Sequence, residues 1–449
     1  MRWAVGLLMG WVVAGCTPQP PPPNMLLIII DTLRADHTSA YGYPLDTTPH
    51  LRALASEGVR FERTYSPSST TGPSVASLLT AHYPAGHEVS KNGQPLASHT
   101  ITMAEHFRHH GFETAGFVSS FVLDDRFGFG RGFDIYDAEF TQEGETHPVE
   151  NWAGAQISTP FDRRAEETTR RAIEWLENRP DPRRPFLLVV HYFDPHFPYV
   201  PPEPFLDRFG GGDTPEVNGD PQPREIQRYD EEIAYTDDQI GRLLAGLETT
   251  HPEQPTIVGV IGDHGEGLGD HGVLRHGLLL YEPFVRVPWI LRLPGGTAAG
   301  TSVSTPVSLV DVLPTLSELA GLEPASPGSA GRSLAGRILR DQPLEEMPIF
   351  FQRRHYEPGT VEGRPVEGMQ YGVRLDHWKY LEAPDEGTVE LYDLQHDEPE
   401  QENEAARRPD QVARLRALLT PWLANAGSTP AVPLEETSRE ALEALGYVE

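Results

Sequence analysis

Three largely apolar runs constrain the fold more than any other feature of this chain. They cover residues 25–30, 186–190 and 256–261. Short runs without polar alternation are typical of strands buried on both faces, as in parallel sheets covered by helices. The runs therefore predict an α/β fold, and open α/β sheets bind their ligands at the carboxyl ends of such strands.

Polar side chains follow each of these runs. Asp31 follows the first run, and Asp263 with His264 follows the third between two glycines. The second run leads into His191 and into the Pro-rich loop that holds His196. An adjacent carboxylate and imidazole suit a hard or borderline divalent cation. The strand ends therefore predict a metal site, although a loop-capping role is the structural alternative for Asp31 alone.

A candidate nucleophile, Thr71, lies at the first turn of a helix predicted over residues 71–80. Pro73 suits this turn, where its missing N–H is not needed. A hydroxyl at this place meets unpaired backbone N–H groups and the positive end of the helix dipole, which favour phosphate or sulfate. The alternative is an ordinary capped helix, because Thr and Ser are common caps.

The first residues indicate export rather than folded structure. Arg2 precedes an apolar run over residues 3–13, and the sequence Val-Ala-Gly-Cys then ends at Cys16, the only cysteine. This pattern is typical of a bacterial lipoprotein signal, with an ordinary secretory signal as the alternative. Residues 17–23 are Pro-rich and predict a stiff tether. We expect a lipid anchor at Cys16 in the bacterial cell envelope, in the outer membrane and facing the periplasm or exterior, because Thr17 is not the Asp associated with inner-membrane retention.

The charge balance restricts the partners. The 449 residues include 36 Lys and Arg against 66 Asp and Glu, a formal net charge of −30. Nucleic acids require a basic surface and are not expected as partners. An anionic substrate must therefore be attracted by a local positive centre such as a metal. The oligomeric state is not predicted.

A Pro-, Gly- and Ser-rich stretch over residues 324–331 predicts a boundary, after which the chain changes character. Short strands are predicted there, which suggests a small antiparallel sheet followed by a helix over residues 412–424. The expected organisation is a signal with its lipidated cysteine, a tether, a catalytic domain and a C-terminal subdomain, at residues 1–16, 17–24, 25–323 and 332–449.

Several stretches together resemble the sulfatase family of the alkaline phosphatase superfamily. They are residues 26–36 with 42–43, 71–80, 194–196, 262–266, 276–288 and 308–321, and, near the end, 390–394 with Glu400 and Asn403. The resemblance extends from about residue 25 to the end. It implies a central mixed, mostly parallel sheet sandwiched by helices, with a smaller C-terminal antiparallel-sheet subdomain.

The resemblance also implies a divalent cation beside a nucleophile. Asp31, Asp263 and His264 match the positions of metal ligands, and Thr71 occupies the nucleophile slot. The choice among Ca²⁺, Mn²⁺, Mg²⁺ and Zn²⁺ stays open. The implied substrate is an anionic ester.

Further positions complete the implied site. His196 falls where the family keeps a histidine that binds the substrate or protonates the leaving group. His276 falls where the family keeps a positively charged side chain near the transferred group. Thr32 replaces the second Asp of the usual pair after the first strand. His191 and Arg34 are additional candidates at the strand ends.

The departures from the family pattern bear on the chemistry. Sulfatases place Cys or Ser in the nucleophile slot, convert it to formylglycine and follow it four residues later with Arg; here these positions are Thr71 and Val75. Because Cys16 is distant, no cysteine-derived formylglycine is expected. A family segment with Lys and His aligns with residues 118–121, which contain neither.

These departures favour phosphoester chemistry. A formylglycine hydrate has two oxygens, so one can attack sulfur and the other can expel sulfate, whereas Thr71 has a single oxygen. Water can instead attack the phosphorus of a threonine phosphoester in line. The site resembles those of phosphodiesterases and of phosphoglycerol or phosphoethanolamine transferases in this superfamily. The alternatives are a transferase that passes a phospho-headgroup to a lipid or glycan, and a non-catalytic metal-binding protein.

Overall fold

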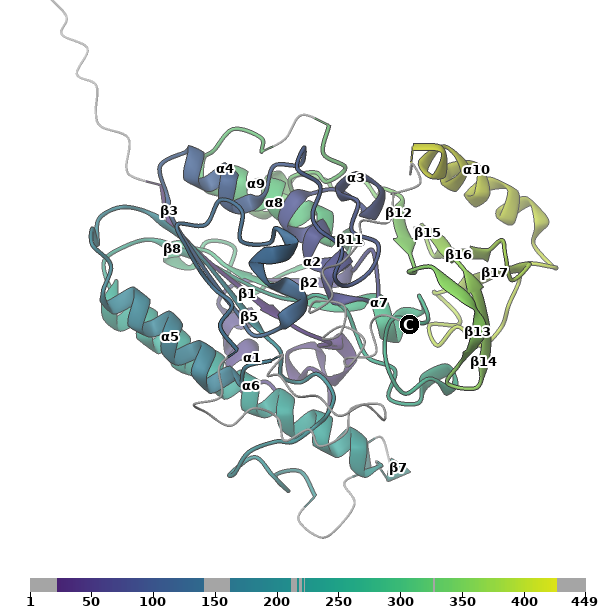
Figure 1. Cartoon of the computed structure of the whole chain (residues 1–449), viewed down its shortest axis with the longest axis horizontal. Coiled ribbons are helices and arrows are strands. Elements are labelled where there is room, and N and C mark those ends of the chain that lie inside the picture. The colour runs from purple at the N-terminus through teal and green to yellow at the C-terminus, as the bar shows by residue number, and fades with distance from the viewer. Residues whose placement is uncertain are drawn as a thin grey trace, which may run out of the picture.

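A nine-stranded mixed sheet forms the centre of the computed structural model (Figure 1), which describes residues 22–140, 162–210, 216–217, 220–221, 223–325 and 328–425. The strand order is β10-β2-β9-β8-β1-β5-β3-β4, and β11 also pairs with β2. The strands are β1 (Asn24–Ile30), β2 (Val59–Tyr65), β3 (Glu113–Val118), β4 (Ile135–Asp137), β5 (Phe186–Tyr192), β8 (Thr256–Gly262), β9 (Arg286–Arg292), β10 (Thr301–Val303) and β11 (Val307–Ser308).

The three apolar runs form the adjacent central strands β8, β1 and β5. Strand β1 pairs in parallel with both neighbours, and Ile29 lies opposite His191 while Ile30 lies opposite Gly262. Strand β9 is antiparallel to β2 and β8, so the sheet is mixed and mostly parallel, as predicted. Strand β5 is two residues longer than its apolar run. His191, expected beyond the strand end, therefore lies within the strand.

Helices cover both faces of this sheet (Figure 1), and a separate buried apolar cluster fills each interface. One face is covered by α1 (Pro49–Ser56), α5 (Ala165–Glu177) and α6 (Arg224–Thr250). The other is covered by α2 (Thr71–Thr80), α4 (Met103–His109), α8 (Val312–Leu319) and α9 (Ala335–Arg340). The short helix α3 (Pro84–His87) packs against α2, and α7 (Glu282–Val285) belongs to a further apolar cluster, which it shares with strands of the C-terminal sheet. This arrangement confirms the predicted α/β sandwich.

The C-terminal part forms the predicted smaller antiparallel sheet. Its strands are β12 (Ile349–Gln352), β15 (Tyr371–Leu375), β16 (Trp378–Ala383) and β17 (Thr388–Asp393), and α10 (Pro409–Asn425) packs on it. A two-stranded hairpin in this part pairs β13 (Tyr356–Val361) with β14 (Arg364–Gly368). A second two-stranded pair, β6 (Glu216–Val217) with β7 (Asp220–Pro221), lies earlier in the chain, before α6. The β13–β14 hairpin was not predicted, because its exposed residues lack apolar alternation.

A buried lysine joins the small sheet to the central domain. Lys379 of β16 is fully buried, and its ammonium lies 3.2 Å from Glu282 at the start of α7 and 3.0 Å from Glu400. Tyr65 of β2 donates a hydrogen bond of 3.0 Å to Glu282. The two parts are therefore connected by charged groups that water does not reach.

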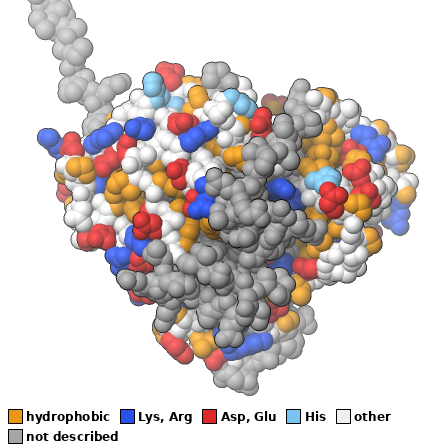
Figure 2. All heavy atoms as spheres, viewed as in Figure 1, with side chains coloured by type: hydrophobic (Ala, Val, Ile, Leu, Met, Phe, Trp, Pro, Cys, Tyr) orange, Lys and Arg blue, Asp and Glu red, His pale blue; other side chains and the backbone are white. Residues whose placement is uncertain are grey.

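The surface carries charges of both signs. On the described part of the face in Figure 2, acidic and basic side chains are interspersed rather than separated into patches. In the described ranges, no helix has both the length and the apolar character needed to cross a membrane.

Candidate active site

Three buried side chains converge where the central strands end. Asp31 follows β1, His191 lies in β5 and Asp263 follows β8, and the ligand atoms of these residues lie within 4.8 Å of one another. His264 lies beside them, with its Nε2 atom 3.5 Å from Asp31 Oδ1 and 3.6 Å from Asp263 Oδ2. The parallel register of adjacent strands brings these distant residues together. The converging group contains two of the three residues predicted as metal ligands, Asp31 and Asp263, together with the additional candidate His191, and the third, His264, lies beside it.

Backbone geometry fixes the Asp263 carboxylate. Its Oδ1 atom accepts hydrogen bonds from the backbone N–H groups of Thr32, at 3.1 Å, and His264, at 2.6 Å. Thr32 adopts a φ of +53°, which is unusual for a β-branched residue and is found mainly where neighbouring contacts enforce it. This turn aims the Thr32 N–H group at Asp263 and leaves Asp263 Oδ2 without a hydrogen-bond partner among the described residues.

The electrostatics of the cluster suit a cation. Burial raises the pKa of Asp31 well above its ordinary value and that of Asp263 to about 8. Burial also lowers the pKa of His191 and His264 to about 3. Neither ring nitrogen of His191 has a hydrogen-bond partner in the described ranges. Asp263 Oδ2 likewise has no hydrogen-bond partner among these residues. Two carboxylates and two imidazoles fit a divalent cation, which would offset the crowded negative charge.

Thr71 is the first residue of α2 and is completely buried beside this cluster. Its hydroxyl lies 3.4 Å from each oxygen of Asp31 and 3.2 Å from His264 Nε2. His264 Nδ1 lies 2.8 Å from the Gly265 carbonyl, to which it can donate a hydrogen bond, so Nε2 carries the lone pair that faces Thr71. The candidate nucleophile therefore touches the candidate metal site.

Two further histidines are joined to His264 by ring contacts. The His276 ring is 4.6 Å from that of His264 and 4.8 Å from that of His196, measured between centroids. His196 Nδ1 lies 2.6 Å from the Phe197 carbonyl, which directs Nε2 away from its own loop. Burial lowers the pKa of both His196 and His276. The structure thus brings the predicted His196 and His276 to the site that holds Thr71.

Arg34, the remaining candidate at the strand ends, binds neighbouring loops instead of pointing at the nucleophile. Its guanidinium forms ion pairs of 2.6 Å with Asp36 and with Asp270, and it donates to the Glu266 carbonyl at 3.1 Å. These contacts fasten the chain after β1 to the loop after β8. Arg34 is therefore engaged in holding the two loops and is not aimed at Thr71.

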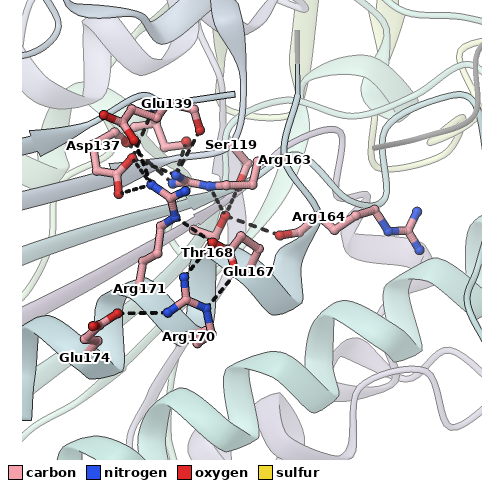
Figure 3. Close-up of polar contacts among 11 residues, drawn as sticks. Ser119, Asp137, Glu139, Arg163, Arg164, Glu167, Thr168, Arg170, Arg171 and Glu174 are labelled. Carbon is pink, nitrogen blue, oxygen red and sulfur yellow. Dashed lines mark hydrogen bonds and ion pairs between the residues drawn. The ribbon is translucent and has the colours of Figure 1, made fainter. Parts of the chain in front are cut away.

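Arginines also occupy the corner between β3 and α5, beside the segment that lacks the family's Lys and His (Figure 3). Arg163 is buried and donates to the Val118 carbonyl at 3.0 Å, to Asp137 at 2.7 Å and to Thr168 at 2.9 Å. The Arg164 side chain points away from this group in Figure 3 and donates to the Val200 carbonyl. Arg163 therefore fastens the corner and does not replace the missing lysine.

The sequence alone did not assign roles to Glu266, Tyr199 and Asn92. Glu266 accepts a hydrogen bond of 3.1 Å from the Tyr199 hydroxyl, and Asn92 accepts one of 2.7 Å from the N–H group of Gly72 beside the nucleophile. The glycine-flanked motif that ends at Glu266 was a signal for this residue. Nothing in the local sequence marked Tyr199 or Asn92, because their partners lie far away along the chain.

The sulfatase family model matches residues 23–322, and the model for the C-terminal part of N-sulphoglucosamine sulphohydrolase matches residues 269–425. This chain belongs to the sulfatase family. The membership confirms the predicted resemblance and the expectation of a sulfuric or phosphoric ester hydrolase of that family.

Individual comparisons agree with this membership. A choline-sulfatase from Rhizobium meliloti is 28% identical over 450 residues, covering 88% of this chain and 85% of the relative. The phosphonate monoester hydrolase of Agrobacterium radiobacter shares the fold with a TM-score of 0.71 at 22% identity, covering 90% of this chain and 96% of the other. BT4656, solved with its substrate D-glucosamine-2-N,6-O-disulfate, has a TM-score of 0.70 at 21% identity and covers 90% and 98%. These likenesses to solved structures concern the fold.

Proposed function

We propose that this sulfatase-family protein hydrolyses phosphate esters, with phosphodiesters favoured, through a covalent intermediate on Thr71. The observation that carries the proposal is the position of the Thr71 hydroxyl, at the start of α2 and 3.4 Å from both oxygens of Asp31. The positive end of the α2 dipole favours an anionic group at the same place.

The reaction would run as two displacements at phosphorus. The Thr71 hydroxyl loses its proton toward Asp31, and its oxygen attacks phosphorus as the bond to the leaving oxygen breaks. His196 or His276 donates a proton to that leaving oxygen. Water then attacks the phosphorus of the Thr71 ester, and the same histidine takes one proton of the water. The bond between phosphorus and the Thr71 oxygen breaks, Asp31 returns its proton to that oxygen, and the phosphate product leaves.

The candidate metal ligands in this chain are Asp31, His191 and Asp263, with His264 adjacent. When bound there, a divalent cation would lower the pKa of the Thr71 hydroxyl and shield the negative charge of the transferred group. The unpartnered Asp263 Oδ2 and His191 nitrogens support this assignment.

The choice of phosphate over sulfate rests on the nucleophile itself. Thr71 offers one oxygen, so a sulfated threonine would need direct attack of water on sulfur, whereas a phosphorylated threonine is open to in-line attack. The sulfatase pattern has Arg four residues after the nucleophile, and Val75 occupies that position here. This difference also favours phosphate ester hydrolysis over sulfate ester hydrolysis.

We further propose an anionic ester as substrate and a lipid anchor at Cys16 in the cell envelope.

The test uses purified chain that is stripped with a chelator and reloaded with Ca²⁺, Mn²⁺, Mg²⁺ or Zn²⁺, and panels of aryl phosphates, phosphodiesters and sulfate esters. We expect metal-dependent phosphodiester turnover that falls at least about a thousandfold in Thr71→Ala. Thr80→Ala is the matched control, because Thr80 is a buried threonine of the same helix whose hydroxyl donates to the Ala76 carbonyl and to no other partner in the described part of the chain.

Other outcomes separate the alternatives. Product formed only with an added acceptor alcohol would identify a transferase. Stoichiometric metal binding without turnover on any panel would identify a non-catalytic protein. Turnover of sulfate esters that survives in Thr71→Ala would refute the assigned nucleophile.

A further inference from the structure

Thr70 is a helix cap whose hydroxyl is not used for capping. It is the N-cap residue of α2, directly before the candidate nucleophile, and its side chain makes no capping hydrogen bond. Threonine at this position normally accepts a hydrogen bond from the first turn of its helix. Thr70 is buried, and its Oγ1 atom has no hydrogen-bond partner within the described ranges. Folded proteins leave few buried hydroxyls without a partner, so this one needs an explanation.

The Thr70 hydroxyl faces Gly277, the residue after His276. A Cβ atom at Gly277 would lie 3.5 Å from Thr70 Oγ1 and 3.8 Å from the hydroxyl oxygen of Tyr356. Tyr356, at the start of β13, donates a hydrogen bond of 3.1 Å to the Gly277 carbonyl. The start of α2, the segment after β8 and the start of β13 therefore meet beside the nucleophile.

An arginine from the C-terminal part lies at the same place. The Arg354 guanidinium lies over the ring of Tyr356, 4.3 Å from its centre. The pKa of His276 is lowered to about 3, mainly by burial and further by the charges of Arg275 and Arg354. The effect of a charge decreases with distance, so Arg354 lies near the His276 ring. This side of the site therefore carries positive charge, although the chain as a whole has a net charge of −30.

Arg275 belongs to a different part of the site. Its guanidinium lies 3.6 Å from the centre of the Phe197 ring, and it forms an ion pair of 2.8 Å with Glu225 in the first turn of α6. Arg275 therefore lies beside the loop after β5 and helix α6, whereas Arg354 lies on the side of the C-terminal part.

We propose that Arg354 and Thr70 form a binding site for a second negatively charged group of the substrate, carried by the leaving alcohol. Guanidinium and hydroxyl groups both donate hydrogen bonds to carboxylate, sulfate and phosphate oxygens. Because His276 is a candidate proton donor to the leaving oxygen, this subsite lies on the side of the leaving alcohol. The proposal rests on the proposed function and adds a substrate class to it, an ester whose alcohol part is itself anionic.

The kinetic test compares two aryl methyl phosphodiesters in the metal-loaded full chain, with para-hydroxybenzoate or para-hydroxybenzamide as the leaving phenol. The two phenols have nearly the same shape and differ in charge. In Arg354→Met, we expect KM for the carboxylate ester to rise about tenfold, because a charge-assisted hydrogen bond from a half-buried arginine is lost. KM for the carboxamide ester and both kcat values should change by no more than about threefold, since the subsite does not touch the reacting atoms. Thr70→Val should raise KM for the carboxylate ester about threefold, and Arg354→Lys should retain part of the preference.

Arg364→Met is the matched control. Arg364 of β14 is a half-buried arginine of the adjacent hairpin, but its guanidinium donates to the His271 carbonyl. This variant should keep the preference for the carboxylate ester. Equal changes in KM for both esters in Arg354→Met, an unchanged KM, or the same loss in Arg364→Met would overturn the proposal.

A second measurement needs no turnover. Binding of para-hydroxybenzoate and of para-hydroxybenzamide to the metal-loaded full chain is followed by saturation-transfer NMR. We expect the benzoate to bind more tightly than the benzamide, and to lose this advantage in Arg354→Met. Equal affinities in the wild-type chain, or an advantage that survives in Arg354→Met, would overturn the proposal. If the wild-type chain hydrolysed no ester, the proposed function would fail, and this measurement would still decide whether Arg354 binds an anion.

Discussion

Lys379 provides the sharpest test of how the two sheets are held together. It is one of only two lysines in the chain, it is fully buried, and its ammonium lies within 3.2 Å of the carboxylates of both Glu282 and Glu400. Lys379→Met retains the aliphatic volume and removes the charge. Two buried carboxylates then remain with no cation between them.

The expected cost follows from this geometry. Removing one partner from a buried ion pair typically lowers the free energy of unfolding by about 3–5 kcal/mol, because the other charge stays buried. The double variant Lys379→Met with Glu400→Gln should recover part of the loss, since it removes one of the two carboxylates. The free energy of unfolding is measured by denaturation in guanidinium chloride at pH 9, where Glu400 is ionised in the folded state. Lys91→Met is the control, and it should stay within about 0.5 kcal/mol because Lys91 is only half-buried.

The pH dependence of the stability cost of Lys379→Met provides an independent test. Burial raises the pKa of Glu400 to about 8, from an ordinary value of 4.5. Between these values the folded state binds more protons than the unfolded state, so the stability contributed by Glu400 decreases as pH rises. The cost of Lys379→Met should therefore be smaller at pH 5, where Glu400 is protonated in the folded state, than at pH 8. A cost below about 1 kcal/mol at both values would refute the assignment of Lys379 as the cation for two buried acids.

Three further predictions concern the metal site, the β3–α5 corner and the anchor. Asp263→Asn should weaken divalent-cation binding at least about tenfold, measured by calorimetry on the chelator-stripped chain. Arg163→Met should lower the free energy of unfolding by about 2 kcal/mol, because Asp137 keeps Arg171 as a second partner and is partly exposed. Cys16→Ala should move the protein from the membrane to the soluble fraction of the producing cell, and unchanged fractionation would contradict the proposed lipid anchor.

The sequence was most informative where local pattern and tertiary context agree. The apolar runs became β1, β5 and β8, because a strand buried on both faces needs apolar residues on both sides. The polar residues after two of these runs, Asp31 and Asp263, therefore met at one edge of the sheet. Strand order was not predictable in the same way, because it depends on pairings between segments more than 150 residues apart, such as Leu26 with Leu188.

The sequence was less informative where distant contacts decide the outcome. The apolar run ends before His191 and a Pro-rich loop follows, which predicts that His191 lies beyond the strand end. Pairing with β1 and β3 on either side instead extends β5 through this residue. The β13–β14 hairpin has no amphipathic pattern and is held instead by contacts such as that of Glu362 with the N–H group of Arg275. Glu266 was visible in a motif, but its partner Tyr199 is 67 positions away.

The position of the site relative to the proposed anchor leads to a final prediction. The tether from Cys16 would join the domain at Asn24, where β1 begins, whereas Asp31 lies at the other end of the strand. Seven residues at about 3.3 Å each separate these ends by about 20 Å. The site is therefore expected to open away from the anchoring bilayer. Lipidated protein in vesicles should hydrolyse a soluble phosphodiester as fast as Cys16→Ala does, without hydrolysing phospholipid of the same vesicle; faster hydrolysis of that phospholipid would refute this orientation.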